Sequence, residues 1–231
     1  MEIKPPNHLG VIIDGNRRWA TTRGLQPWEG HRHGAENIEK FLKWCAELKI
    51  PQVSIYTLST ENLNRPKREL DELFKLFKKF LVKWLESDEL DKYEIRVKFL
   101  GDFRKLPDDV VKLMKRIMKK TLKYDKLVFN FLVAYGSKFE LTQAFRKVAE
   151  KIVKSGRIRI TQKDIEENLL VQSPVDLIIR TGGMSRLSNF LLWQSDYAEI
   201  YVTNTLWPDF SKAELIKAIK WFNGIQRNFG R

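Results

Sequence analysis

A short apolar run followed at once by charged residues opens the informative part of the chain: Leu9-Gly-Val-Ile-Ile-Asp-Gly-Asn-Arg-Arg-Trp19. Its first five residues predict a buried strand that ends at Asp14. Further apolar runs predict strands at 53–58, 95–100, 127–133, 176–179 and 200–203. Apolar residues at helical spacing predict helices at 35–48, 70–85, 107–124, 138–154, 164–171 and 211–224.

Strands and helices therefore alternate along the chain. This order favours an α/β fold with a mostly parallel sheet flanked by helices. No linker, repeat or low-complexity tract interrupts the 231 residues. We therefore expect one domain that spans residues 1–231.

The composition excludes some classes of protein. With 43% hydrophobic and 31% charged residues, the chain is not mostly disordered. Its single cysteine, Cys45, excludes a disulfide framework and a Cys-rich zinc site. The first residues do not resemble a signal peptide, and no apolar run approaches the ~20 residues of a membrane span. We expect a cytoplasmic protein.

The formal net charge of +13 predicts a polyanionic partner: nucleic acid, anionic membrane or a phosphorylated small molecule. Residues 81–160 hold 20 basic and 11 acidic residues, so this third carries +9 of the +13. It includes Lys112, Lys115, Lys119 and Lys123, which lie on one side of a predicted helix. They predict a solvated face or, alternatively, peripheral contact with anionic lipid.

Polar residues follow three of the predicted strands, at 14–19, 59–65 and 180–188. Parallel α/β sheets bind ligands outside the carboxyl ends of their strands. We therefore expect these three segments, far apart in the sequence, to converge on one edge of the sheet.

The first segment suits a diphosphate. Gly15 allows a sharp turn and a close backbone approach to a ligand. Arg17 and Arg18 supply guanidinium groups for phosphate oxygens, and Asp14 can hold a Mg²⁺ ion that bridges such oxygens. The alternative is a turn with solvated arginines.

The other segments are also polar. Residues 59–66 gather hydrogen-bonding groups ahead of a long helix, and an ordinary capping loop is the alternative. Residues 180–188 resemble an anion cradle of Arg180, Arg186 and Ser188 around two glycines, with structural ion pairs as the alternative. The spacings GxxxxGK[ST] and GxGxxG do not occur, so the usual nucleotide-binding fingerprints are absent.

Two further residues are candidates for the site. His31, near a predicted helix start, is a candidate phosphate contact. Glu199 is a candidate second carboxylate for the metal, with capping or ion pairing as its alternative. A zinc site would need more ligands than three histidines and one cysteine at these spacings provide.

Together these motifs resemble those of the cis-prenyltransferases, the family of undecaprenyl and dehydrodolichyl diphosphate synthases. The matching segments follow the family order along almost the whole chain: HLGVIIDGNRRWA (8–20), GH (30–31), STENLNRP (59–66), RTGG (180–183), RLSNFLLWQ (186–194), YAE (197–199) and LWPDF (206–210). The resemblance implies a six-stranded parallel sheet, a homodimer and Mg²⁺-dependent addition of isopentenyl diphosphate, in cis, to an allylic diphosphate. The implied product is a long-chain polyprenyl diphosphate, a precursor of a glycosyl carrier lipid.

The resemblance also implies roles for individual residues. Asp14 would be the essential carboxylate and, with Glu199, would contact the metal. Asn62 matches a residue linked to removal of the proton at carbon two, but an amide is a poor base, so we expect it to position the proton acceptor. The implied substrate-binding residues are Gly15, Asn16, Arg17, Arg18 and His31 for the allylic diphosphate, Arg180, Arg186 and Ser188 for isopentenyl diphosphate, and Trp19, Ser59, Thr60, Glu61, Arg65 and Leu187 beside them.

A series of apolar side chains is expected to line a hydrophobic tunnel for the growing chain, with plain core packing as the alternative: Phe74, Phe77, Phe80, Leu81, Trp84, Phe129, Phe131 and Val133. Apolar walls would keep water from an allylic cation.

The chain departs from the family pattern at several positions. Pro27 replaces a phosphate-contacting arginine of many bacterial members, and Leu63 replaces a common tryptophan. Met184-Ser185 replaces a glutamate and its variable neighbour, which leaves metal contacts beyond Asp14 and Glu199 open. Arg17-Arg18 in place of Gly-Arg is similar to the archaeal and eukaryotic branches. It favours geranylgeranyl diphosphate as the primer, with farnesyl diphosphate as the alternative.

Two other functions compete with this one. A nucleic-acid-binding protein would use the +13 charge, but no RRM, helix-turn-helix or zinc-finger signature supports it. A non-catalytic partner subunit of a prenyltransferase would lack the Asp14 motif, which this chain retains. A DDxxD pair is also absent, which excludes the trans-type prenyl synthases.

Overall fold

The strands of the protein form one sheet in which every neighbouring pair is parallel. The computed structural model describes residues 3–156 and 159–228. Within them the strand order is β3-β4-β2-β1-β5-β6. The strands are β1 (His8–Ile12), β2 (Gln52–Ser59), β3 (Ile95–Leu100), β4 (Leu127–Tyr135), β5 (Leu177–Arg180) and β6 (Glu199–Val202). The predicted six-stranded parallel α/β fold is confirmed.

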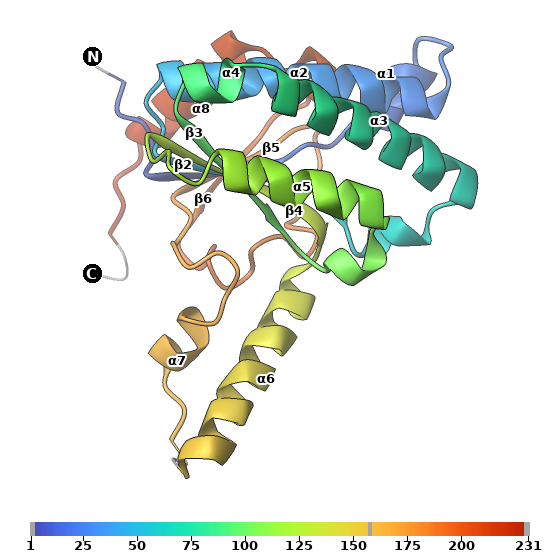
Figure 1. The fold of residues 1–231 in the computed structure, drawn as a ribbon. Helices are drawn as coiled ribbons and strands as arrows, with labels where there is room; N and C mark the ends of the chain where they lie inside the picture. Colours follow the sequence, from blue (N-terminus) through green and yellow to red (C-terminus); the bar gives the residue numbers. More distant parts are fainter. Residues whose placement is uncertain (1–2, 157–158, 229–231) are drawn as a thin grey trace.

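Helices flank this sheet (Figure 1). They are α1 (Asn16–Thr21), α2 (Pro27–Glu47), α3 (Lys67–Glu86), α4 (Glu89–Lys92), α5 (Asp108–Lys120), α6 (Ser137–Ser155), α7 (Gln162–Glu166) and α8 (Lys212–Asn223). Short 3-10 helices span Glu61–Asn64 (η1), Phe103–Lys105 (η2) and Trp207–Asp209 (η3). In Figure 1, α2, α3 and α5 lie together on one side of the sheet, whereas α6 projects away from the sheet with α7 beside it.

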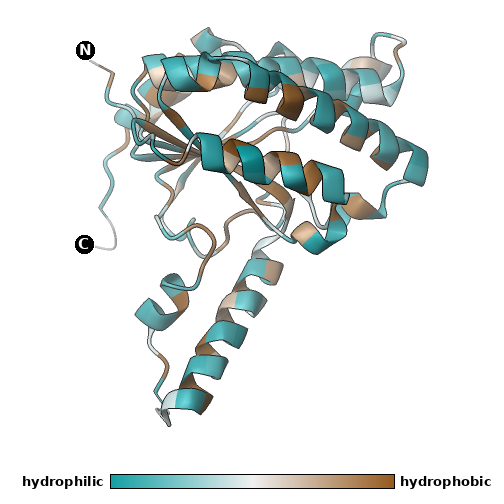
Figure 2. Cartoon of the chain, in the orientation of Figure 1, coloured by the Kyte–Doolittle hydropathy of each residue, from teal (hydrophilic) through white to brown (hydrophobic). Residues whose placement is uncertain are grey.

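Side-chain alternation along the strands divides the core between the two faces of the sheet. On β4, Phe129 and Phe131 join the large cluster under α2, α3, α5 and α8, whereas Leu132 joins a smaller cluster on the opposite face. Figure 2 shows hydrophilic colour over the outward sides of α3 and α5, as expected for helices that bury one apolar face. Within the described residues, no helix has the length and apolarity needed to cross a bilayer.

The boundaries of the predicted elements were correct to within a few residues, with three exceptions, and the short helices α1 and α4 were not predicted. Helix α2 begins at Pro27, whereas the sequence predicts a start near Ala35. A capping box formed by Gln26 and Glu29, together with Pro27 at the first helical position, starts the helix earlier. The predicted loop 61–66 contains η1. The predicted helix 164–171 is confined to Gln162–Glu166, and Thr161 caps it.

Candidate active site

The three polar segments expected at the carboxyl edge of the sheet do lie there. Ile12 is in register with Arg180 on one side of β1 and with Tyr56 on the other. Asp14 therefore follows β1 next to the end of β5, and Ser59 ends the neighbouring β2. Parallel strands place their carboxyl ends together, and this brings the segments into one site.

Asp14 is held between two guanidinium groups. Arg180 Nη2 donates to Asp14 Oδ2 at 2.8 Å, and Arg18 Nη2 donates to Asp14 Oδ1 at 3.3 Å. Thr181 fixes the Asp14 backbone, accepting from its N–H at 2.9 Å and donating to its carbonyl at 2.7 Å. Thr181 lies within the RTGG motif but was not among the predicted site residues, because its role depends on contacts across strands.

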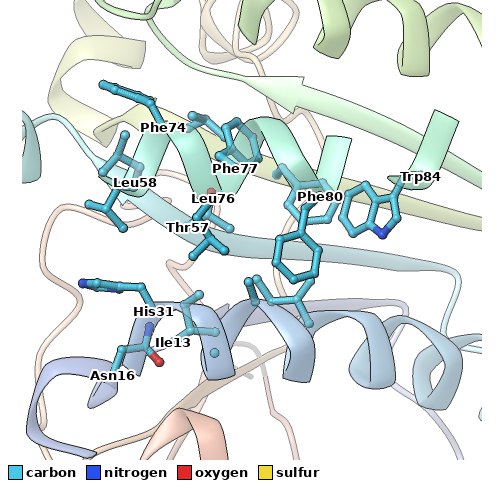
Figure 3. Close-up of a pocket in the computed structure, with 16 residues that line it drawn as sticks. Ile13, Asn16, His31, Thr57, Leu58, Phe74, Leu76, Phe77, Phe80 and Trp84 are labelled. Atoms are coloured by element: carbon cyan, nitrogen blue, oxygen red, sulfur yellow. The ribbon is translucent and has the colours of Figure 1, made fainter. Parts of the chain in front are cut away.

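The turn after Asp14 requires glycine. Gly15 has φ +111°, and a Cβ at this position would lie 2.7 Å from Leu206 Cδ2. Helix α2 then packs closely on α1, since a Cβ on Gly34 would lie 2.4 Å from Asn16 Oδ1. These close approaches place Asn16 beside His31 of α2 at one end of a cavity (Figure 3).

The cradle at residues 180–188 is organised around a buried arginine. Arg180 is 3% exposed, and its Nη1 donates to Ser188 Oγ at 2.9 Å and to the carbonyl of Arg186. The buried Arg180 Nε and Asn16 Oδ1 have no hydrogen-bond partner among the described residues. Buried polar atoms without partners are rare, and the N–H of Arg180 Nε is a donor that suits an anionic ligand at this edge. Asn16 Oδ1 is an acceptor that faces Gly34 of α2, so it does not indicate an anion.

Two arginines and a histidine surround one carboxylate at the start of α3. Oε1 of Glu69 lies 3.3 Å from Arg65 Nη1, 3.7 Å from His31 Nε2 and 3.8 Å from Arg17 Nε. Burial, helped by the charges of Arg65 and Arg17, lowers the pKa of His31 to about 4. His31 is therefore neutral at pH 7. Sequence reasoning missed Glu69, because a glutamate in the first turn of a helix is an ordinary feature.

An apolar cavity of about 750 Å³ leads inward from this edge, between α2, α3 and the sheet. Figure 3 shows Asn16 and His31 at one end of the cavity and Trp84 at the other. Six of the eight expected tunnel residues line it: Phe74, Phe77, Phe80, Trp84, Phe131 and Val133. Leu81 and Phe129 do not, because they pack in the core with no exposed surface.

The 59–65 segment closes another side of the site. Ser59 and Asn62 exchange hydrogen bonds, from Ser59 N–H to Asn62 Oδ1 at 3.2 Å and from Asn62 N–H to Ser59 Oγ at 3.1 Å. Thr60 N–H donates to the carbonyl of Tyr135 at 2.8 Å. Glu61 Oε1 accepts from Asn189 Nδ2 at 3.0 Å, so this segment contacts the loop after Ser188.

Two further expected residues lie in the loop that follows the RTGG motif. Arg186 is exposed. Leu187 is half-buried and packs against the smaller core cluster that contains Leu132, on the face of the sheet opposite α3.

Two of the expected site residues lie away from this centre. Trp19 is nearly buried, with its Nε1 donating to Asp209 at 2.7 Å and its ring packed against His33 and Arg23. Glu199 is in register with Leu177, at the amino end of the sheet, about 10 Å along the strands from the level of Arg180. Within one chain, Glu199 and Asp14 are therefore not brought together.

Comparisons with known proteins agree on one family. A family model described as "Putative undecaprenyl diphosphate synthase" matches residues 12–230. The chain is 42% identical to a tritrans,polycis-undecaprenyl-diphosphate synthase (geranylgeranyl-diphosphate specific) of Methanopyrus kandleri, with 100% of this chain and 86% of the relative covered. It is 42% identical to an isoprenyl transferase of Aquifex pyrophilus, with 100% and 98% covered.

A solved structure shows the same fold. Lavandulyl diphosphate synthase from Lavandula x intermedia, in complex with dimethylallyl diphosphate, matches with a TM-score of 0.93 and 32% identity over 98% of both chains. The motifs of the active-site edge, the parallel sheet and the similarity to these relatives agree. The chain therefore belongs to the undecaprenyl diphosphate synthase family of cis-prenyltransferases.

Proposed function

We propose that this transferase condenses isopentenyl diphosphate units, in cis, onto an allylic diphosphate primer and releases a long-chain polyprenyl diphosphate. One observation carries the proposal: a cluster of cationic and polar side chains stands at one end of an apolar cavity of about 750 Å³. A prenyl diphosphate has a matching shape, with a charged head and an apolar tail.

We assign the two diphosphates to different groups of side chains at this edge. The allylic diphosphate would lie over Gly15, Asn16, Arg17, Arg18 and His31, with its tail in the cavity. Isopentenyl diphosphate would contact Arg180, Arg186 and Ser188. The unsatisfied donor Arg180 Nε supports an anionic ligand beside Asp14.

Each cycle would break the bond between the allylic carbon and its diphosphate oxygen. The arginines stabilise the charge that develops on the leaving diphosphate. The double bond of isopentenyl diphosphate then attacks the allylic carbon, and loss of the proton at carbon two forms the new cis double bond. Asn62, fixed by Ser59, would position the diphosphate or water that accepts this proton. The apolar walls keep water from the cation.

Mg²⁺ is the cofactor that fits this arrangement. Among the described residues, no three His, Cys, Asp or Glu side chains gather as a metal-binding group. Mg²⁺, however, is commonly bound by one or two carboxylates plus the oxygens of a substrate phosphate. Asp14, whose side chain is 30% exposed at the edge, fits that pattern. Bound there, the ion would neutralise charge on the departing diphosphate.

The primer we propose is geranylgeranyl diphosphate, with farnesyl diphosphate as the alternative. Arg17-Arg18 and the name of the Methanopyrus relative support the longer primer. The released product would serve as a precursor of a glycosyl carrier lipid. A nucleic-acid-binding function is not favoured, because the family match and the relatives are prenyl-transferring enzymes.

We also propose that residues 1–231 act as one catalytic domain in a homodimer. The edge strand β6 and its surroundings expose Tyr197, Ile200 and Trp221 by 54%, 44% and 41%. Edge strands with exposed apolar surface are suited to association. A second copy would also be needed to bring Glu199 to the metal beside Asp14.

The decisive experiment incubates the purified protein with Mg²⁺, labelled isopentenyl diphosphate and allylic primers of several lengths. We expect elongated polyprenyl diphosphates, with the highest kcat/KM for geranylgeranyl diphosphate, and no product when EDTA replaces Mg²⁺. A failure to elongate any primer would show that the proposed function is wrong.

A further inference from the structure

Asn189, in the loop after Ser188, connects this loop to the 59–62 segment and to the start of α6. Its Nδ2 donates to Glu61 Oε1 at 3.0 Å, next to Asn62. Its Oδ1 accepts from the N–H of Lys138 at 2.9 Å, in the first turn of α6. Its carbonyl accepts from the N–H of Ser137 at 2.8 Å. One residue therefore joins the 59–62 segment, the start of α6 and the 186–188 segment.

The backbone of this loop has an unusual conformation. Ser188, Asn189 and Leu191 have φ values of +52°, +64° and +40°. Such values are costly for residues other than glycine, and asparagine tolerates them better than most. The neighbouring structure must hold Ser188 in place, and the hydrogen bonds of Asn189 are suited to do so. Ser188 Oγ is in turn the acceptor for Arg180 Nη1.

Glu61 is an anionic acceptor in this contact. Although partial burial opposes ionisation, hydrogen bonds from its own backbone, Asn189, Ser59 and Thr60 hold the pKa of Glu61 below its usual range. The Asn189 amide must therefore present its NH₂ group, not its oxygen, to the Glu61 carboxylate. The oxygen then faces the Lys138 N–H, which fixes the orientation of the amide.

We propose that Asn189 is a positioning residue that couples the isopentenyl diphosphate cradle of Arg180, Arg186 and Ser188 to the segment that carries Asn62. In this role Asn189 acts through its protein contacts with Glu61, Lys138 and Ser137. It fixes Ser188 on one side and, through Glu61, the backbone of Asn62 on the other. This role rests on the proposed function, since only an elongation reaction needs both segments in register.

The test reverses the direction of the hydrogen bond between residues 189 and 61. Asn189→Asp keeps the size and the acceptor for Lys138 N–H but places a second carboxylate oxygen against Glu61. We expect kcat to fall about 10-fold or more, as for loss of a hydrogen bond to a charged group, with a smaller change in the KM for isopentenyl diphosphate. In the double variant Asn189→Asp/Glu61→Gln, the new amide at position 61 can donate to the new carboxylate at position 189. We expect kcat of the double variant to recover above that of Asn189→Asp.

Glu61→Gln alone supplies the second single effect of the cycle, and its remaining oxygen can still accept from Asn189. Coupling is shown when the double variant is more active than the product of the two single effects predicts. An Asn189→Asp variant with wild-type kcat, or a double variant that is no better than Asn189→Asp, would overturn the proposal.

A second measurement does not depend on turnover. In the ligand-free protein, Asn189→Asp should speed amide hydrogen exchange within 59–65 relative to the wild type, and the Glu61→Gln partner change should reverse this. Unchanged exchange at 59–65 contradicts the coupling even if the wild type elongates. Faster exchange in a protein that elongates no primer would instead contradict the proposed function.

Discussion

At the scale of single residues, the proposed chemistry depends most on Asp14. Its carboxylate lies between Arg18 and Arg180, at the point where β1 ends. We predict that Asp14→Ala lowers kcat about 1000-fold, since a metal-linked carboxylate contributes several kcal/mol to the transition state. The fold should survive, because Arg180 keeps its bonds to Ser188 and Arg186. Steady-state kinetics and thermal unfolding measure the two effects, and unchanged turnover would refute the metal role.

His8 governs stability rather than catalysis. It is buried, its Nδ1 lies 3.0 Å from the carbonyl oxygen of Pro174, and its Nε2 lies 2.8 Å from Ser54 Oγ. Asn130 Nδ2 donates to the same Ser54 oxygen at 3.0 Å. Burial lowers the pKa of His8 to about 4. The unfolded chain therefore binds this proton first, near pH 6.5, and the contribution of the neutral imidazole is lost as the pH falls from 6.5 towards 4.

We predict that the free energy of unfolding falls by about 2 kcal/mol between pH 7 and pH 5 on account of His8 alone. Urea unfolding of the wild type and of His8→Gln at pH 7 and at pH 5 measures this change in the free energy of unfolding. The pH dependence of His8→Gln should be smaller by that amount, and an equal pH dependence in the two proteins would contradict the prediction. His31, whose pKa is also about 4, contributes in the same direction in both proteins.

At the scale of elements, α3 controls the inner end of the cavity. Trp84 lines this cavity and also a second one, of about 490 Å³, bounded by Glu39, Lys83 and Tyr93. Its Nε1 donates to Glu39 at 3.2 Å, and its ring packs on Phe131. The indole therefore separates the two spaces.

We predict that Trp84→Ala joins the two cavities and shifts the products to longer chains, as measured by mass spectrometry of the dephosphorylated polyprenols. The change should also cost about 3–5 kcal/mol of stability. Leu81→Ala is the matched control, since Leu81 is one turn away and buried in the core without lining the cavity. It should destabilise the protein without lengthening the product. Equal product lengths in all three proteins would contradict the role of Trp84.

At the scale of the whole molecule, Glu199 and Asp14 lie at opposite ends of the sheet, so a shared site requires two copies. Mixing unfolded Asp14→Ala and Glu199→Ala chains and refolding them tests this. A mixed dimer would keep one intact site if the two residues meet across a two-fold interface, and activity should return to roughly a quarter of the wild type. Mixtures as inactive as the separate variants would refute the shared site.

Helix α5 and the turn after it present a basic surface to solvent. Lys112, Lys115, Lys119 and Lys123 are all exposed, and Leu122 among them is 60% exposed. We predict that changing the four lysines to glutamine weakens co-sedimentation with anionic vesicles at least 10-fold, at about 1 kcal/mol for each lysine. Changing Lys138, Lys147, Lys151 and Lys154 of α6 alters the net charge equally and is the control. Equal losses in both variants would show that only net charge matters.

The sequence determined the main features of the fold and the composition of the edge. Apolar periodicity is a local property, and it predicted the strand–helix alternation; the carboxyl-end rule then predicted that 14–19, 59–65 and 180–188 would meet. The family motifs along the chain predicted the class of reaction, because they carry the residue types that bind diphosphates.

Only the tertiary structure decided which side chains contact one another. Sequence spacing does not show that Glu69 lies among Arg17, His31 and Arg65, that Asn189 reaches Glu61, or that Glu199 starts its strand at the far end of the sheet. It also could not separate Leu81 in the core from Trp84 beside the cavity. The physical reason is that these contacts depend on strand register and helix packing, which join residues that are distant along the chain.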